Sequence, residues 1–367
     1  DLTNMETSYI FKEFFDRTLN TNCFESRSDN RFVDISKREN YLFNSSINGI
    51  EDSDLIFLIG ANPRYEATIL NARIRKSYVN NNTKIISLNE VGDLTYPYEN
   101  LDGTTKILKE IFEGKHKISN QIIDAKKPLI IIGESFFNLK TSKYLFSLIK
   151  EFLNKNNKIN KDFNSLNILS CDASTVGNYD LGLVNQEKSL LENLRDHYFE
   201  ILFLVGQDNL DFDKKNEFII YQGSHGDRGA EIADIILPGS AYTEQDGYFT
   251  NLEGKIQKAS KASYPPGEAK EDWQIINELS ECISGRKLFN DKDELESSMF
   301  NYLNLQKEKQ NNFVEENNNK DFDEFFNENL VVVLKAYYFS NVIARSSKTM
   351  VECNNSKFNF KSTGTEG

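Results

Sequence analysis

The stretch Asp54-Leu55-Ile56-Phe57-Leu58-Ile59-Gly60 decides the fold that the sequence predicts. A continuous apolar run that leads into a glycine is typical of a strand buried on both faces of a parallel sheet. In the next segment, 67–79, Leu70, Ile74 and Tyr78 follow one another at four-residue spacing, which indicates a helix with one apolar face. Residues 84–88 form a second short apolar run. Together the three segments predict a βαβ unit.

Short apolar strands alternate with amphipathic helices along most of the remaining chain. Further helices are expected at 105–112, at 144–153 and from Glu271 onward, and further strands at 129–133, 199–206 and 218–221. This alternation predicts a doubly wound α/β fold with mainly parallel sheets. The loops at the carboxyl ends of the strands are expected to gather along one edge, where a ligand would bind. Those loops follow Gly60, Gly133, Gly206 and Gly223.

The helix that begins near Glu271 has a clear start signal. The turn Pro265-Pro266-Gly267 precedes it, and Glu271 and Asp272 place negative charge at the positive end of its dipole. The apolar spacing predicts a buried stripe made of Trp273, Ile276, Leu279 and Ile283.

Changes in composition divide the chain into three parts. Residues 1–285 carry the α/β pattern. Residues 286–329 are charged, rich in Asn and weakly periodic, which indicates a linker or a partly helical surface segment. Residues 330–367 open with the β-rich run 330–335 and indicate a small C-terminal element.

The charge balance and the spacing of metal-binding residue types argue against several classes of protein. With 43 Lys and Arg against 56 Asp and Glu, the net charge of −13 lacks the basic face that a nucleic-acid binder needs. No apolar run approaches the roughly 20 residues of a membrane span. The cysteines and histidines are too dispersed for a zinc, redox or iron–sulfur motif, and the thiols are expected to be buried and reduced. These residues are Cys23, Cys171, Cys282, Cys353, His116, His197 and His225.

Two loops that follow predicted strands could carry chemistry. The loop Gly60-Ala61-Asn62-Pro63-Arg64 combines a glycine, a helix start and an arginine, as an anion cradle would. A nucleotide site normally adds an acidic residue at the end of the next strand, whereas this chain has Leu88-Asn89-Glu90. The loop 223–229 contains Ser, His, Asp and Arg, but the members of a catalytic triad converge from distant positions, which favours a flexible turn. The basic cluster Arg64, Arg73, Arg75 and Lys76 is interpreted as an interface or a solvated helix face.

Four segments, in this order, resemble the recurring motifs of the molybdopterin oxidoreductase fold family. They are residues 54–63, 233–238, 244–257 and 266–273. Within that superfamily, other segments are similar to the 75 kDa iron–sulfur subunits of respiratory complex I, NADH:ubiquinone oxidoreductase. These segments are 71–77, 93–96, 219–227, 241–244 and 344–350.

The resemblance implies a scaffold that has lost its ancestral pterin cofactor. In the complex I subunits, grouped cysteines in an N-terminal half hold 2Fe–2S and 4Fe–4S clusters, and this half is expected to be missing before Asp1. The resemblance implies no cofactor in residues 1–367 and no direct membrane insertion. Its expected partners are the cluster-bearing half and neighbouring peripheral-arm subunits, on the matrix side of the mitochondrial inner membrane. An Asn- and Phe-rich composition suits an organelle-encoded chain.

Departures from the family pattern imply that the cofactor site has eroded. Active relatives place a metal ligand a few residues beyond the position of Cys23, where this chain has Arg27-Ser28-Asp29-Asn30. They also place Asp-Pro-Arg where Leu88-Asn89-Glu90 stands here. We therefore expect no catalytic residue, no metal ligand and only a remnant loop made of Gly60, Asn62 and Pro63. The alternative is an active molybdenum- or tungsten-pterin oxidoreductase, such as a formate dehydrogenase relative, with its site near Asn62 and Ser28.

Overall fold

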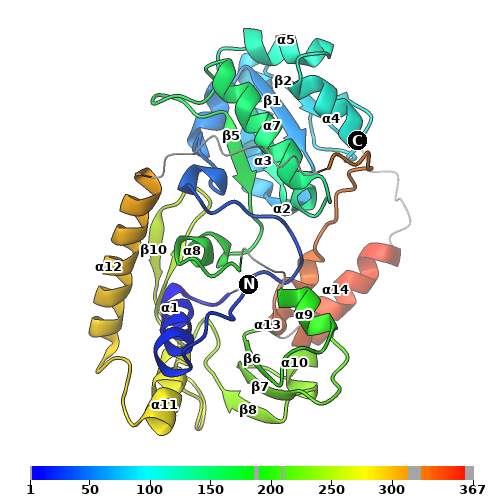
Figure 1. The fold of residues 1–367 in the computed structure, drawn as a ribbon. Coiled ribbons are helices and arrows are strands. Elements are labelled where there is room, and N and C mark those ends of the chain that lie inside the picture. The colour runs from blue at the N-terminus through cyan, green and yellow to red at the C-terminus, as the bar shows by residue number, and fades with distance from the viewer. Residues whose placement is uncertain (1, 186–189, 208–209, 211, 313–323, 360–367) are drawn as a thin grey trace.

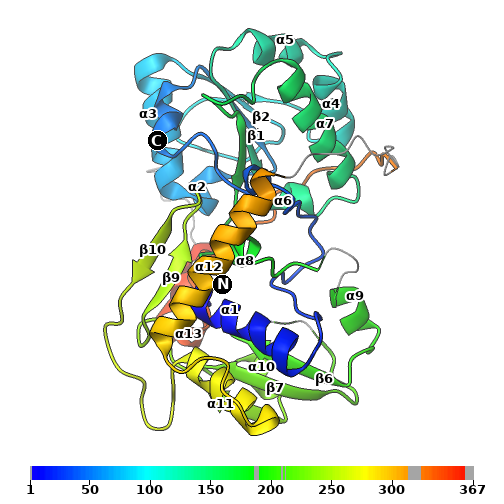
Figure 2. The same cartoon turned by 60° about the vertical axis from the view of Figure 1, so that its left-hand side comes forward.

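A computed structural model describes residues 2–185, 190–207, 210, 212–312 and 324–359. Figure 1 shows two lobes, one above the other. The first lobe, residues 43–170, is built round a five-stranded sheet. The second lobe, residues 2–20 and 175–312, holds a three-stranded sheet and a two-stranded hairpin. Helix α12 (Lys292–Asn311) runs along the second lobe toward the first (Figure 2).

The sheet of the first lobe is parallel throughout, with strand order β3-β2-β1-β4-β5. Phe57 of the central strand pairs with Ile86 on one side and with Ile130 on the other. A parallel sheet with the first strand at its centre confirms the predicted fold class. The strands are β1 (Leu55–Ile59), β2 (Lys84–Ser87), β3 (Glu99–Asn100), β4 (Pro128–Gly133) and β5 (Leu166–Leu169).

Strand β1 buries side chains on both faces of this sheet. Phe57 and Ile59 belong to the core under α4, α5 and α7, whereas Ile56 and Leu58 belong to the core under α3. The predicted helices at 67–79, 105–112 and 144–153 are thereby confirmed. The helices are α2 (Pro63–Glu66), α3 (Thr68–Asn81), α4 (Thr105–Phe112), α5 (Lys117–Asp124), α6 (Glu134–Phe137) and α7 (Ser142–Lys155), with 3-10 turns η2 (Arg38–Asn40) and η3 (Asn48–Asp52) nearby.

The second lobe combines a parallel sheet, in the order β6-β7-β8, with an antiparallel hairpin. Its largest core joins α1, α11 and α12 through Tyr9, Ile276 and Met299. The strands are β6 (Ile201–Val205), β7 (Phe218–Gly223), β8 (Ile235–Pro238), β9 (Gly247–Thr250) and β10 (Ile256–Ala259). The remaining helices are α1 (Met5–Glu13), the π-helix η1 (Phe14–Thr18), α8 (Thr175–Asp180), α9 (Leu190–Arg195), α10 (Arg228–Glu231) and α11 (Asp272–Ser284).

The expectation of a single ligand edge is wrong, because the glycines that end the strands belong to two sheets. Gly60 and Gly133 end neighbouring strands of the first sheet. Gly206 follows β6 and Gly223 ends β7, both in the second sheet. Alternation along the sequence shows that strands are parallel, but it carries no information about which strands share a sheet.

Three smaller expectations also need correction. On α11, Ile283 is 55% exposed, and the buried apolar residues are Ile275 and Ile276, with Trp273 and Leu279 only partly buried. None of the four cysteines is fully buried: Cys23 and Cys282 are exposed, and Cys171 and Cys353 are partly buried. The run 330–335 is extended but forms no strand, because it pairs with no strand in the described part of the chain, and of its residues only Leu330 is buried.

Helices make up much of the rest of the C-terminal part. Helix α12, within the stretch 286–329, buries Leu295, Met299 and Leu303. After the extended segment come η4 (Tyr337–Phe339), α13 (Val342–Ser346) and α14 (Lys348–Asn359). Within the described ranges, no helix has the length and apolar character needed to cross a membrane.

Replacing Gly133 by alanine should destabilise the first lobe. A Cβ at this position would lie 2.2 Å from the carbonyl oxygen of Gly60, and neither strand can move without disturbing the sheet. We expect Gly133→Ala to lower the free energy of unfolding by about 1–3 kcal/mol, as overpacking of a core does. Gly226→Ala is the matched control, because a Cβ there would contact nothing within 4 Å. Urea unfolding of both variants checks this, and equal stabilities would contradict it.

Candidate functional site

The loops after β1, β4 and β5 meet at the carboxyl edge of the first sheet, where a ligand of this fold would bind. Gly60, with φ +62°, turns the chain at the end of β1. Asn62 is 4% exposed, its side-chain amide donates to the carbonyl oxygen of Val91 at 2.9 Å, and its backbone N–H donates to the Glu66 carboxylate. The predicted remnant loop is therefore held by groups of its own chain.

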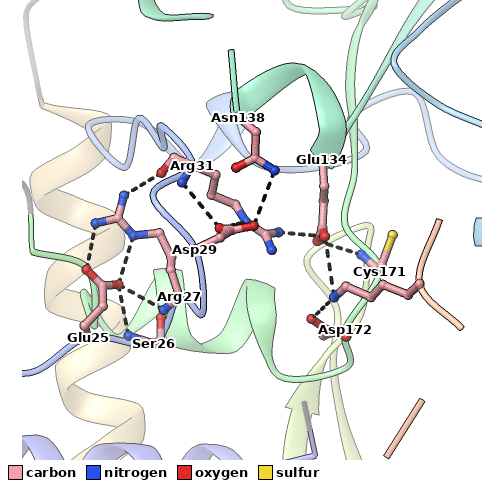
Figure 3. Close-up of polar contacts among 10 residues, drawn as sticks. Glu25, Ser26, Arg27, Asp29, Arg31, Glu134, Asn138, Cys171 and Asp172 are labelled. Carbon is pink, nitrogen blue, oxygen red and sulfur yellow. Dashed lines mark hydrogen bonds and ion pairs between the residues drawn. The ribbon is translucent and has the colours of Figure 1, made fainter. Parts of the chain in front are cut away.

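A buried arginine from the loop 21–36 reaches into this edge (Figure 3). Arg31 Nη1 lies 2.6 Å from a carboxylate oxygen of Glu134, which follows Gly133. Its Nε lies 2.5 Å from Asp29, whose other oxygen accepts a 3.4 Å hydrogen bond from Asn138. The side chains of Arg31 and Glu134 are 9% and 11% exposed. This pair therefore fixes the N-terminal loop against the end of β4.

Glu134 also ties together β5 and the C-terminal part. Its carboxylate accepts the backbone N–H of Cys171 at 3.0 Å, just after β5. Lys335 Nζ lies 3.6 Å from the same carboxylate and forms an ion pair with Asp172. Figure 3 shows Glu134 beside Arg31 on one side and beside Cys171 and Asp172 on the other. Both oxygens of Glu134 are thus engaged by groups of the chain itself.

The segment that could supply a metal donor lies beside a second ion pair. Arg27 and Glu25 are 2.7 Å apart, and Arg27 also donates to the carbonyl oxygens of Arg31 and Asn185. Ser28 is exposed, and among the described residues no hydrogen bond or ion pair joins it to the loop Gly60–Pro63. The described part of the chain also contains no group of three His, Cys, Asp or Glu side chains placed to hold a metal ion.

Burial and charge shift the pKa values of the groups at this edge. Burial alone would lower the pKa of Arg31, but the charges of Glu134 and Asp29 outweigh it and keep the guanidinium charged. Burial raises the pKa of Glu66 from its ordinary value of 4.5 to about 7. The hydrogen bond from the Asn62 N–H opposes this shift, and the charge of Glu134 adds to it. Burial and the carboxylates of Glu134 and Glu66 raise the pKa of the Cys171 thiol. The thiol is therefore a protonated group and a poor nucleophile.

Leu330 fills the space in front of the remnant loop. It is 1% exposed, and its methyl carbons lie 3.3 Å from the point where a Cβ on Gly60 would stand. Asn89 donates its side-chain amide to the Leu330 carbonyl oxygen, and Ser135 Oγ accepts the N–H of Val333 at 2.9 Å. The pterin cofactor implied by the fold family does not fit these residues. The carboxyl edge of the first sheet, where such a cofactor would bind, is filled by side chains of the chain itself.

The loop 223–229 does not form a catalytic triad. Ser224 Oγ lies 3.0 Å from His225 Nδ1, but the carboxylate of Asp227 pairs with Arg345 at 2.7 Å and caps α10. The one acidic side chain of this loop is therefore turned away from the imidazole that a triad would need it to orient. The loop instead forms part of the carboxyl edge of the second sheet.

The basic cluster on α2 and α3 is partly neutralised by two acidic neighbours. Arg64 pairs with Asp93, and Arg73 and Lys76 both pair with Glu51.

Sequence reasoning missed the groups that do converge on the site, namely Arg31, Glu66, Glu134, Asp172 and Lys335. The only signal available for them was the position of Glu134 and Asp172 just after strand ends.

Comparison with known proteins identifies two families along the chain. The profile of the molybdopterin oxidoreductase family matches residues 1–282. The profile of the C-terminal domain of the NADH-ubiquinone oxidoreductase G subunit matches residues 295–353.

Individual relatives agree with these matches. The NADH-quinone oxidoreductase G subunit of Rickettsia bellii is 36% identical over 372 residues, which cover 99% of this chain and 53% of that protein. The NADH-ubiquinone oxidoreductase 75 kDa subunit of Reclinomonas americana is 34% identical over 96% of this chain and 54% of its own length. The mitochondrial 78 kDa subunit of Candida albicans is 37% identical over 86% of this chain and 45% of its own length. The chain thus spans about half the length of the curated relatives it matches.

Removing the positive charge of Arg31 should destabilise the protein strongly. Arg31→Met leaves Asp29 and Glu134 without their buried partner, which typically costs about 3–5 kcal/mol. The double variant Arg31→Met, Glu134→Gln also removes one of the two carboxylate charges that faced Arg31, and it should restore about 2 kcal/mol of the lost free energy of unfolding. Lys127→Met is the control, since Lys127 and its partner Asp52 are 50% and 68% exposed, and it should cost less than about 1 kcal/mol. Urea unfolding checks this, and equal losses for Arg31→Met and Lys127→Met would contradict it.

Replacing Glu66 by glutamine should change how stability depends on pH. Between pH 4.5 and about 7 the folded protein keeps a proton on Glu66 that the unfolded chain has released, so wild-type stability falls as pH rises. Glu66→Gln cannot titrate, and at pH 8 it should be more stable than the wild type by on the order of 2 kcal/mol, with little difference at pH 4.

The comparison between wild type and Glu66→Gln isolates this one group. The pKa of Glu6 is also raised by burial to about 7, but Glu6 titrates in both proteins and cancels. Glu90→Gln is the control, because Glu90 is exposed, and its stability should follow the wild type at each pH. A stability difference between Glu66→Gln and wild type that stays constant from pH 4 to 8 would contradict the prediction.

Proposed function

The chain belongs to the molybdopterin oxidoreductase family, and we propose that it is the carboxyl-terminal half of a large subunit of NADH:quinone oxidoreductase, respiratory complex I. The proposal is supported by relatives that bear this name and by the match of residues 295–353 to the C-terminal domain of the G subunit. In this role the α/β fold is a scaffold that holds neighbouring parts of the enzyme in place. It performs no redox chemistry of its own.

The observation that carries the scaffold proposal is the filled carboxyl edge of the first sheet. Arg31 and Glu134 occupy it with a buried ion pair, and Leu330 covers Gly60. An active pterin enzyme needs this edge open and needs a donor side chain directed at the metal, whereas Ser28 is exposed and unconnected to the remnant loop. The alternative reading as a formate dehydrogenase relative therefore has little support. The relatives are named as NADH-quinone or NADH-ubiquinone oxidoreductase subunits.

Electrons would then pass through iron–sulfur clusters held outside this stretch. The dispersed thiols support this, because cluster ligation needs cysteines close together. Within such a complex, the partners of this chain are the cluster-bearing half and the adjoining peripheral-arm subunits. A place on the matrix side of the mitochondrial inner membrane fits the relatives from Candida albicans and Neurospora crassa, whose names include the word mitochondrial.

We also propose three functional parts within the chain, with boundaries at 285 and 329. The end of the first family match at residue 282 supports the first boundary. Residues 286–329 would then lead from the α/β part to the small C-terminal element 330–367, with α12 packed against the α/β part.

A substitution in the remnant loop should leave respiration intact if the loop is only structural. In the assembled complex, Asn62→Ala should keep NADH oxidation per assembled enzyme near the wild-type rate. Phe57→Ala, in the core, should instead lower the amount of assembled complex, because such truncations cost about 3–5 kcal/mol. Native gels give the amount of assembled complex, and NADH:quinone assays give the rate.

Two outcomes would overturn the scaffold proposal. One is an Asn62→Ala complex that assembles normally but has lost NADH oxidation. The other is stoichiometric molybdenum or tungsten in the purified protein, measured by elemental analysis. Failure to co-purify with other complex I subunits, tested by mass spectrometry of a tagged chain, would overturn the assignment to the complex.

A further inference from the structure

A C-terminal strap, which we define as residues 330–345, connects the carboxyl edges of the two sheets. In Figure 1 it descends from the first lobe to α13, beside the sheet of the second lobe. Its near end is Leu330 and its far end is Arg345. The strap is held at three places, and the chemistry of the contacts differs between its two ends.

The near end is held by apolar burial and backbone hydrogen bonds. Leu330 lies in the core of the first lobe with Ile59 and Phe136. Its N–H donates to the carbonyl oxygen of Gly103 at 2.8 Å, and just before it the N–H of Glu328 donates to Thr105 Oγ1 at 2.8 Å. Such contacts are insensitive to ionic strength, because they involve no charge that salt can screen.

The middle and the far end are held by partly buried ion pairs. Lys335 pairs with Asp172 and is 46% exposed. Arg345 Nε lies 2.7 Å from Asp227 Oδ2, with side chains that are 16% and 25% exposed. Ion pairs that keep some contact with solvent are weakened as salt is added, less than fully exposed pairs but more than apolar contacts. The far half of the strap is therefore held by contacts that salt weakens, whereas its near end is not.

The far end covers the edge of the second sheet. Asn341, Val342 and Ile343 line a cavity of about 70 Å³ together with Gly206 and Gly223. The buried Asp272 also lines this cavity, and its carboxylate accepts hydrogen bonds from two glutamine side chains, those of Gln222 and Gln245. Displacement of the far end would expose these polar groups to water.

We propose that the strap is a hinged latch, fixed at Leu330 and released at its far end when the Arg345–Asp227 pair is broken. Release uncovers the carboxyl edge of the second sheet and leaves the first sheet closed. This device follows from the contacts of the strap alone and holds whether or not the scaffold function proposed above is correct.

Hydrogen–deuterium exchange of the full chain tests the latch. In Arg345→Gln at low salt, the amides of α13 should exchange about fivefold faster than in the wild type, the factor that corresponds to a loss of about 1 kcal/mol. Addition of 0.5 M NaCl, roughly enough to shorten the screening length to a few ångströms, should accelerate α13 in the wild type but add little in Arg345→Gln. The amides of β1 and of residues 328–331 should be unchanged throughout.

Two further variants keep the result specific to the ion pair. Arg345→Lys retains the charge and should protect α13 nearly as well as the wild type. Lys348→Gln removes an exposed charge three residues further along the chain and should have no effect. The proposal is overturned if α13 protection in the wild type does not depend on salt, if Arg345→Gln behaves like Lys348→Gln, or if residues 328–331 open together with α13.

Discussion

Burial of both faces of strand β1 is the constraint on which the first lobe depends. A strand whose alternate side chains all point into apolar cores needs helices on each side, and α3 on one face and α4, α5 and α7 on the other supply them. Because the strands are parallel, every connection returns over a face, and the short loops after Gly60 and Gly133 must meet at one edge. The contact between these two glycines leaves no space for a side chain at Gly133.

The same edge shows how a ligand-binding fold can be closed by its own chain. Arg31 and Glu134 bring opposite charges into a site with little access to water, and each charge is compensated by the other. Such a pair contributes little net stability compared with an apolar core, but the loss of one partner is costly. The pair therefore fixes the position of the N-terminal loop, and Leu330 fills the remaining space in front of Gly60. A scaffold gains from this arrangement, because an empty polar cleft would cost stability without binding anything.

The strap runs from this closed edge to the second lobe. Its near end is part of a core, whereas its far end depends on a partly buried ion pair, so the two ends respond differently to ionic strength. One continuous segment thereby covers the carboxyl edges of two separate sheets. Such a connection links the two lobes through the chain itself.

The sequence by itself determined the local elements and the family. The apolar run 54–60 and the four-residue spacing on 67–79 depend only on neighbours in the chain, and the structure confirms the strand and the helix. The grouping of strands into two sheets, the exposure of Ile283 and the extended path of the strap were decided by tertiary structure. So was the meeting of Arg31, Glu134 and Lys335, which come from segments roughly 100 to 300 residues apart. No local pattern encodes such a meeting, because the charges become neighbours only after the sheet and its helices have packed.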